Sequence, residues 1–459
     1  MVEATPSHPL RALFASTIVS NGVGAAVSFV PPAMEGNALR PPAAISWPLR
    51  GHARNALRAH PVGVTPTSAT SRIGFSCGLS FIGVALGAFA RPSRAKMRRN
   101  RYVACAASAV GLNGPKLSIV VFGATGYIGR AVVEELLARG HAVIAFTREK
   151  SGIKGEDTFA DVQASFGSKG DISVVAGDVN SETSITSALM RYEKIDGVVC
   201  CLASRSGGRQ DSFDIDYQAT INCHAAAKAV KASQFVLLSA ICVQKPLLAF
   251  QEAKLKAEAH LKEESRDMAY SIVQPTAFFK SLLGQVKAVK GGSPYVMFGD
   301  GSIACKPISE EDLAAFIADC FWDPAKRNAT LPIGGPGKAM TFKEQGTLLF
   351  ELQGKEPSLI SVPVALFDLI NGLLDFIAGL WPEKFADIAE YGKIGKYYAT
   401  ECMLVLDKET GTYREDLTPS YGRTTLKAFL TEALQQGSTK LESQQLGAQG
   451  VGERFGMKD

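Results

Sequence analysis

From residue 116 onward, short apolar runs alternate with longer amphipathic stretches. The run at 117–122 is too short for a helix and rich in β-branched residues, which favours a buried parallel strand. A glycine turn, an amphipathic helix and a second apolar run ending before Arg148 follow it. The alternation continues with four more predicted strands, at 172–176, 197–202, 234–239 and 270–273. This pattern predicts an α/β fold with a Rossmann-like doubly wound parallel sheet.

The glycine turn after the first strand has the spacing G-x-x-G-x-x-G. Such glycines let the chain turn tightly, bring bare backbone against a pyrophosphate, and allow the helix to pack close to the strand. The unpaired N–H groups at the start of the helix also favour an anion. We therefore expect the turn to bind a dinucleotide through Gly123, Thr125, Gly126, Tyr127, Ile128 and Gly129.

Arg148 stands at the end of the second strand, where an NAD site usually has an acid. An arginine suits a 2'-phosphate, because it forms bidentate, charge-assisted bonds, so we predict NADP(H). The alternative is an ordinary solvated surface arginine. Later strand ends and the loop at 203–210 should add further cofactor contacts, from Asp178, Val179, Ala203, Pro275 and Thr276.

A second motif concerns catalysis. Ser239 ends the fifth predicted strand, where short-chain dehydrogenases place a catalytic serine, and the segment Phe250-Gln-Glu-Ala-Lys254 follows. Their signature is Y-x-x-x-K, in which the Tyr exchanges the proton and the Lys lowers its pKa and holds the nicotinamide ribose. Phe250 cannot titrate, so ordinary ketone reduction loses its acid. Lys254 and Ser239 are the predicted catalytic residues, for hydride transfer to something other than a carbonyl; the alternatives are a helix-surface lysine and no chemistry at all.

The C-terminal third should supply the substrate pocket. Phe278 and Phe279 would line the nicotinamide face or a flat aromatic substrate, or belong to the core. The stretch 362–380 is strongly apolar but carries Asp368 and Asp375, which places it below the threshold for crossing a membrane. Core packing, a lid or a peripheral membrane face would each explain it. We divide the chain into a leader (1–112), a nucleotide-binding domain (113–290), a mostly helical substrate-binding region (291–434) and a polar disordered tail (435–459).

The leader differs from the rest in charge. Residues 1–103 contain twelve Lys and Arg against two acids, a net charge of +10, which leaves −5 for the remainder. The formal +5 of the whole chain therefore gives no support for nucleic-acid binding, and none is predicted. Nine scattered cysteines, with no C-x-x-C pair, fit a reducing or buried setting, so no metal site is predicted.

The order of segments within the leader predicts its target. An apolar stretch at 13–30 precedes an acid-poor region at 31–72 rich in Pro, Ala, Ser, Thr and Arg, and a second apolar stretch at 73–90 ends in a basic run. This order resembles the bipartite plastid-targeting leaders of algae with secondary plastids, dinoflagellates in particular. We expect cleavage before about residue 106; a simpler disordered leader or a retained anchor is the alternative.

Several longer blocks carry a more specific resemblance: VFGATGYIGR at 121–130, FVLLSAICVQKPLLAFQEAKLKAEAHL at 235–261, YSIVQPTAFFKSLLGQ at 270–285, PYVMFGDG at 294–301, CKPISEEDLA at 305–314 and KYYATECMLVLD at 396–407. From about 116 to 433 the chain resembles the plant-type, NADPH-dependent divinyl chlorophyllide a 8-vinyl reductases, atypical members of the short-chain dehydrogenase superfamily. Gln274 and Cys402 depart from that pattern, which leads us to expect Arg and Ser there.

The resemblance implies a plastid enzyme of chlorophyll biosynthesis that uses NADPH to reduce divinyl chlorophyllide a or a related tetrapyrrole. It also implies substrate contacts from Phe250, Phe278, Phe279 and Lys280, and is consistent with peripheral contact to thylakoid or envelope membranes. The main alternative is a non-catalytic NADP(H)-binding plastid assembly or redox-sensing factor. An isoflavone-reductase-like or nucleotide-sugar enzyme of the same superfamily is a third hypothesis, although sugar epimerases would need the missing tyrosine.

Overall fold

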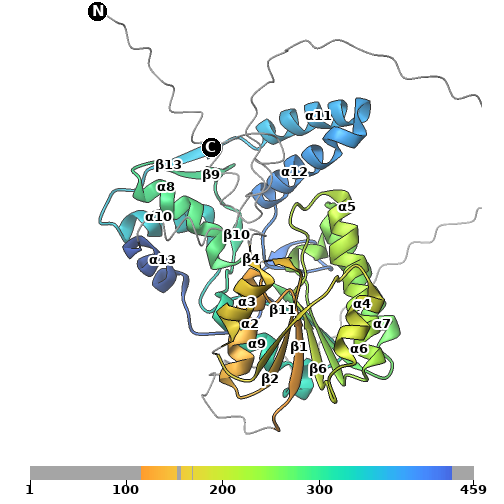
Figure 1. Ribbon diagram of the computed structural model, residues 1–459. Coiled ribbons are helices and arrows are strands. Elements are labelled where there is room, and N and C mark those ends of the chain that lie inside the picture. Colours follow the sequence, from red (N-terminus) through yellow and green to blue (C-terminus); the bar gives the residue numbers. More distant parts are fainter. Residues whose placement is uncertain (1–114, 152–156, 168, 437–459) are drawn as a thin grey trace, which may run out of the picture. The chain divides into compact units, whose positions relative to one another are not determined.

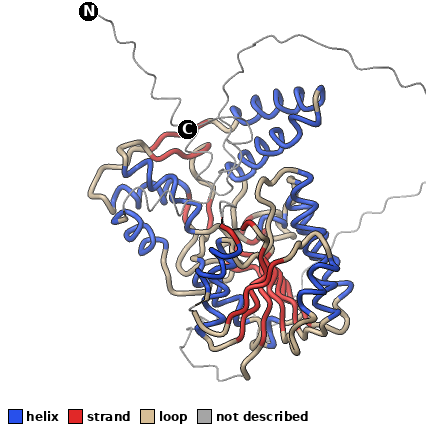
Figure 2. Tube along the Cα trace, viewed as in Figure 1, coloured by secondary structure: helices blue, strands red, loops and turns tan. Residues whose placement is uncertain are grey.

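The computed structural model describes residues 115–151, 157–167 and 169–436 (Figures 1 and 2). The expected leader, 1–112, and nearly all of the expected tail lie outside the described residues.

Within the described residues, seven strands form one parallel sheet in the order β11-β8-β7-β6-β1-β2-β5. The order reverses between β1 and β6, which is where a doubly wound sheet opens a ligand crevice at its carboxyl edge. All six predicted strands and the predicted fold class are confirmed. The seven strands of the sheet are β1 (Ser118–Phe122), β2 (Ala142–Thr147), β5 (Ile172–Ala176), β6 (Gly197–Cys200), β7 (Gln234–Leu238), β8 (Ala269–Pro275) and β11 (Ala329–Ile333).

The seventh strand, β11, was not predicted from the sequence. It contains Pro332, which normally argues against a central strand. Here β11 lies at the edge of the sheet and pairs only with β8, so proline costs no ladder bond on the open side. The sheet therefore uses residues beyond 290, the boundary expected for the nucleotide-binding domain.

Helices cover both faces of the sheet (Figure 1). Alternate residues of β1 point to opposite faces, so Ile119 and Val121 join one core cluster while Val120 and Phe122 join the other. The first cluster is completed by α2 (Tyr127–Ala138), α3 (Phe159–Phe166) and α9 (Glu310–Asp319), and the second by α4 (Glu182–Leu189), α6 (Thr220–Ala229) and α7 (Ala249–Glu264).

The helical segment that follows β6 changes its helix type along its length. A short α5 (Arg209–Asp211) leads into the π-helix η1 (Ser212–Ala219), and α6 follows without a break. A π-helix bonds residue i to i+5 rather than i+4, and such turns are frequent at functional sites. Periodicity cannot distinguish the two helix types over so short a length.

The C-terminal region has a core of its own, in which Phe279 and Tyr295 are fully buried. Strands β9 and β13 pair in parallel, and α8, α10 and α13 pack around them. The elements are α8 (Leu283–Lys290), β9 (Tyr295–Phe298), α10 (Phe342–Glu351), β13 (Leu359–Val362) and α13 (Leu426–Gln435). Smaller strand pairs are β3 (Lys150–Ser151) with β4 (Asp157–Thr158), β10 (Ala304–Cys305) with β12 (Met340–Thr341), and β14 (Val405–Leu406) with β15 (Tyr413–Arg414).

The apolar stretch predicted at 362–380 forms α11 (Ala365–Leu380), which packs against α12 (Pro382–Thr400). Asp368 pairs with Lys396 at 2.5 Å and Asp375 with Lys393 at 3.0 Å, so the acids of α11 face its partner helix. No helix in the described part of the chain is long and apolar enough to span a membrane.

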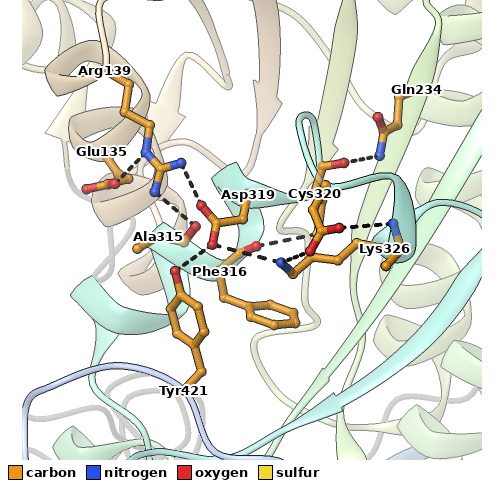
Figure 3. Close-up of polar contacts among 11 residues, drawn as sticks. Glu135, Arg139, Gln234, Ala315, Phe316, Asp319, Cys320, Lys326 and Tyr421 are labelled. Carbon is orange, nitrogen blue, oxygen red and sulfur yellow. Dashed lines mark hydrogen bonds and ion pairs between the residues drawn. The ribbon is translucent and has the colours of Figure 1, made fainter. Parts of the chain in front are cut away.

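A charged cluster lies at the opposite end of the sheet from the crevice, where α2 and α9 end (Figure 3). Arg139 contacts Glu135 at 2.7 Å and Asp319 at 2.8 Å, and the Tyr421 hydroxyl donates to Asp319 at 2.7 Å. Lys326 lies 3.9 Å from the same carboxylate. We call these five residues the amino-end cluster. They fasten the C-terminal segment to the helices of the sheet.

Candidate active site

The glycine turn after β1 is required by close contacts. Gly123 has φ +73°, and a Cβ there would lie 2.8 Å from the carbonyl oxygen of Cys201. A Cβ on Gly129 would overlap the carbonyl oxygen of Gly123. These two glycines therefore allow the turn to pack against β6 and the helix to pack against the turn.

Gly126 leaves the start of α2 open. It is the N-cap of the helix, with no side-chain cap and no acid in the first turn. A Cβ there would meet only the Gly123 oxygen, at 3.2 Å, so the side away from the turn is open. Thr125 and Ile128 are buried behind it. Bare N–H groups and an uncapped helix start fit the pyrophosphate of a dinucleotide.

Tyr127 and Lys280 both contact the carboxylate of Glu310. The Tyr127 hydroxyl donates to Glu310 at 2.6 Å, and the Lys280 ammonium pairs with the same carboxylate at 2.6 Å while lying 4.3 Å from the Tyr127 ring. Phe278 packs edge-on against that ring at 5.7 Å. Burial and Glu310 raise the pKa of the Tyr127 phenol, so it is a weak acid. The group joins the glycine turn to the segment after β8.

The residues expected near the adenosine end lie at neighbouring strand ends. Arg148 is exposed after β2, and burial together with its charge lowers the pKa of Arg205, in the loop after β6. Two approaching guanidinium groups suit a phosphate. Asp178 is exposed after β5 and accepts the backbone N–H of Asn180 at 3.0 Å, whereas Val179 is buried.

The loop at 203–210 follows β6 and is held by acids. The Asp211 carboxylate accepts the backbone N–H groups of Arg205 at 2.9 Å and Ser206 at 2.8 Å. Asp387, on α12, accepts the N–H of Arg209 at 3.2 Å. Ala203 is exposed at the start of the loop. The loop is therefore fixed both to α5, through Asp211, and to α12, through Asp387.

Lys254 is buried and paired. Its ammonium lies 2.9 Å from the carboxylate of Asp216 on η1, and the two side chains are 10% and 1% exposed. The alternative of a helix-surface lysine is therefore wrong. Burial alone would lower the pKa of Lys254, but Asp216 outweighs it and the net pKa is raised. Asp216 therefore holds the lysine in its charged form.

Ser239 is tied to a buried acid. Its hydroxyl donates to Glu258 on α7 at 2.6 Å, and the Gln274 amide donates to the same oxygen at 2.8 Å. Lys262 lies 3.6 Å from the other oxygen of Glu258. Gln274, where we expected an arginine, is thus directed at Glu258 inside the protein. We call Asp216, Ser239, Lys254, Glu258 and Gln274 the Lys254 site.

The aromatic residues divide into two groups. Phe279 is fully buried against Phe429, at 5.1 Å between rings, so the expectation of a substrate contact needs correction: it fills the core of the C-terminal region. Phe278 is half-buried. Phe250 packs in a cluster with Tyr391 and Tyr397 of α12.

Pro275 ends β8 in a buried position, next to Thr276, whose hydroxyl donates to the carbonyl of Lys306. The predicted residues at the ends of β1, β2, β5, β6, β7 and β8 are therefore brought to one edge of the sheet. Three acids at that edge, Asp216, Glu258 and Glu310, were missed. Glu258 had a signal, because it lies one helical turn after Lys254 and so on the same face.

Comparison with known proteins agrees with this geometry. A family model described as NAD(P)H-binding matches residues 123–324. The chain is 51% identical to the divinyl chlorophyllide a 8-vinyl-reductase, chloroplastic, of Zea mays, over 78% of this chain and 92% of that protein. It is 51% identical to the protein of the same name from Arabidopsis thaliana, over 72% of this chain and 80% of that one.

Among solved structures, the leucoanthocyanidin reductase–NADPH complex from Vitis vinifera is similar with a TM-score of 0.52 and 14% identity, over 70% of this chain and all of that one. At that identity the likeness concerns the fold alone.

Proposed function

The chain belongs to the divinyl chlorophyllide a 8-vinyl-reductase family, and from this premise we propose that it reduces the 8-vinyl group of 3,8-divinyl chlorophyllide a to ethyl with NADPH. One observation supports this chemistry above others. The site keeps a buried, charged lysine but has Phe250 in place of the tyrosine that carbonyl reduction needs.

NADPH supplies a hydride when it is bound. The open start of α2 would hold its pyrophosphate, and Arg148 with Arg205 would hold its 2'-phosphate. Lys254 faces Cys200 at the end of β6 and Cys242 after β7, close to the crevice at the carboxyl edge, and would bind the hydroxyls of the nicotinamide ribose. Holding the two reactants in line could lower the barrier by ~7 to 11 kcal/mol.

The reaction needs one hydride and one proton. Addition of hydride to the terminal vinyl carbon leaves negative charge on the carbon joined to the macrocycle, where conjugation spreads it, and no oxyanion forms. Lys254, held as a cation by its ion pair with Asp216, would stabilise this charge. The hydroxyl proton of Ser239 is engaged by Glu258. We therefore assign the proton to solvent.

The C-terminal region is proposed to hold the tetrapyrrole. Tyr397 of α12 donates to the carbonyl of Cys242 at 2.8 Å, which attaches this region to the segment between Ser239 and Phe250. Phe278 and Lys280 lie where that region meets the glycine turn. A flat macrocycle packed there would present its edge to the cofactor.

One assay tests the function. The mature protein is incubated with NADPH and divinyl chlorophyllide a, and reduction is followed as a blue shift of the Soret band. Conversion to the monovinyl pigment is expected. No shift, with NADPH binding intact, would leave the non-catalytic binding protein as the better account.

We further propose that α11 contacts a thylakoid or envelope membrane. Leu369, Leu373, Phe376 and Leu380 recur at helical spacing, and each is more than half exposed. The acids of α11 are turned towards α12, so this face carries no charge. Liposome flotation tests it: the mature protein should float, and Leu373→Glu/Phe376→Glu should not. A wholly soluble mature protein would contradict the proposal.

The named relatives are chloroplastic, which supports a plastid location. We propose in addition that residues 1–112 direct the chain into a complex secondary plastid. Fusing this segment to a fluorescent protein in a dinoflagellate tests it. Plastid fluorescence is expected, and retention in the secretory system would contradict it.

A further inference from the structure

We propose that Asp216 is a positioning residue that fixes both the Lys254 ammonium and the loop at 203–206 for NADPH binding. The catalytic consequence rests on the proposed function, but the binding role does not. Asp216 belongs to neither the glycine turn nor the F-x-x-x-K segment. It acts through the residues that would contact the ligand.

The first contact is with Lys254. The 2.9 Å ion pair joins η1 to α7, and the Asp216 side chain is almost completely buried. A lone carboxylate or ammonium in such a place would be strongly unfavourable, so each requires the other. Lys254 retains donors that the carboxylate does not use, because an ammonium has three. Asp216 thereby sets the direction of an ammonium that can still reach a ribose.

The second contact is with the loop after β6. The other oxygen of Asp216 accepts the backbone N–H of Ser204 at 3.3 Å. Asp211 accepts the next two N–H groups, of Arg205 and Ser206. Two carboxylates therefore hold three consecutive amides of the loop. This loop follows the strand next to β1, at the point where the strand order reverses.

The π-helix explains how both acids reach the loop. Asp211 and Asp216 are five residues apart, and η1 begins directly after Asp211. In a π-helix, residue i bonds to residue i+5, so residues five apart lie on the same side of the helix, whereas in an α-helix the second would be rotated by about 140°. The wider turn therefore places both carboxylates on one side. A regular α-helix would turn one of them away.

Three single variants separate the two contacts. Asp216→Asn removes the charge but keeps an oxygen for Ser204; Asp216→Ala removes both. Asp214→Asn is the matched control, because Asp214 lies on the same π-helix, is exposed and binds only the side chain of Gln210 among the described residues. NADPH affinity is measured by fluorescence titration, with melting temperature measured alongside.

We expect NADPH to bind roughly 10- to 100-fold more weakly to Asp216→Asn, since Lys254 loses the carboxylate that holds its charge in place. Asp216→Ala should be weaker still, and Asp214→Asn should match wild type. Wild-type affinity in a folded Asp216→Asn variant would overturn the proposal.

The pH dependence of NADPH affinity distinguishes a positioning role of Asp216 from a general loss of structure in the variant. The groups acting on Lys254 are Asp216 from η1, Cys200 from β6 with the adjacent Cys201, and Cys242 from the turn after β7. In wild type Asp216 keeps the lysine charged, so its charge should contribute no change in affinity between pH 7 and 9. Without Asp216, burial lowers the pKa of Lys254, so Asp216→Asn should bind more weakly at pH 9 than at pH 7. An equal loss at both values would overturn the positioning role.

A double variant covers the case in which Asp216→Asn fails to fold. Asp216→Asn/Lys254→Gln removes both charges and should fold. Its NADPH affinity should equal that of Lys254→Gln, with no alkaline weakening beyond it; a further independent loss, or failure to fold, would contradict the proposal. All of these titrations use NADPH alone. A failure to reduce the pigment would therefore reject the proposed function without affecting this test.

Discussion

Two charged clusters lie at opposite ends of one sheet, and they differ in how their charges are satisfied. In the amino-end cluster, Asp319 is shared by Arg139, Lys326 and Tyr421, and these groups are partly exposed. In the Lys254 site, the ammonium has one carboxylate partner among the residues that the structure describes, and it is nearly buried. A saturated cluster can only fasten the chain, whereas an ammonium with unused donors can also hold a ligand.

The largest expected effect comes from removing the charge at the carboxyl edge. Lys254→Gln keeps a donor for Asp216 but loses the cation, so turnover at saturating NADPH should fall roughly 100- to 1,000-fold. Single-turnover pigment reduction measures this, with the melting temperature as a check on folding. A rate near wild type would remove Lys254 from the mechanism.

The matching change at the amino end should affect stability instead. Arg139→Ala loses its bonds to Glu135, Asp319 and the Ala315 carbonyl. These groups are partly exposed, so we expect the free energy of unfolding to drop by about 1 to 3 kcal/mol. Turnover per folded molecule should stay unchanged. A large loss of turnover at unchanged stability would erase the contrast between the two clusters.

The sequence predicted the fold better than the site. Six strands and the glycine turn have local signals, namely apolar runs and fixed spacing, and all were found. Strand β11 was hidden by Pro332, which only an edge position permits. The partners of Lys254 and Ser239 were missed, because acidic residues on helices are usually exposed and the sequence alone does not show which of them become buried. The burial of Phe279 depends on α13, far away in sequence.

A smaller effect is expected at the adenosine end. Arg148→Ala should weaken NADPH binding about tenfold, because a surface phosphate contact is lost, and should leave NADH binding unchanged. Parallel titrations with the two cofactors measure the ratio. Equal losses for both would show that Arg148 does not contact the 2'-phosphate.

The smallest effect concerns the missing phenol. Phe250→Tyr restores Y-x-x-x-K, yet Phe250 is packed among apolar and aromatic side chains. The added hydroxyl should cost about 1 to 3 kcal/mol of stability and leave vinyl reduction per folded molecule unchanged. Thermal unfolding and the Soret assay measure both. A marked gain in turnover would mean that the reaction needs an acid at this position after all.

The central claim is that this site adds a hydride from the cofactor to the terminal carbon of a vinyl group, and that the inner carbon receives an exchangeable proton. The direct measurement is mass spectrometry of the monovinyl product after reaction with NADPH deuterated at both C4 positions, and separately in D2O. We predict one deuterium from NADPH in the terminal methyl of the new ethyl group and one from D2O in its methylene. Reversed positions, or no deuterium from NADPH, would contradict the account.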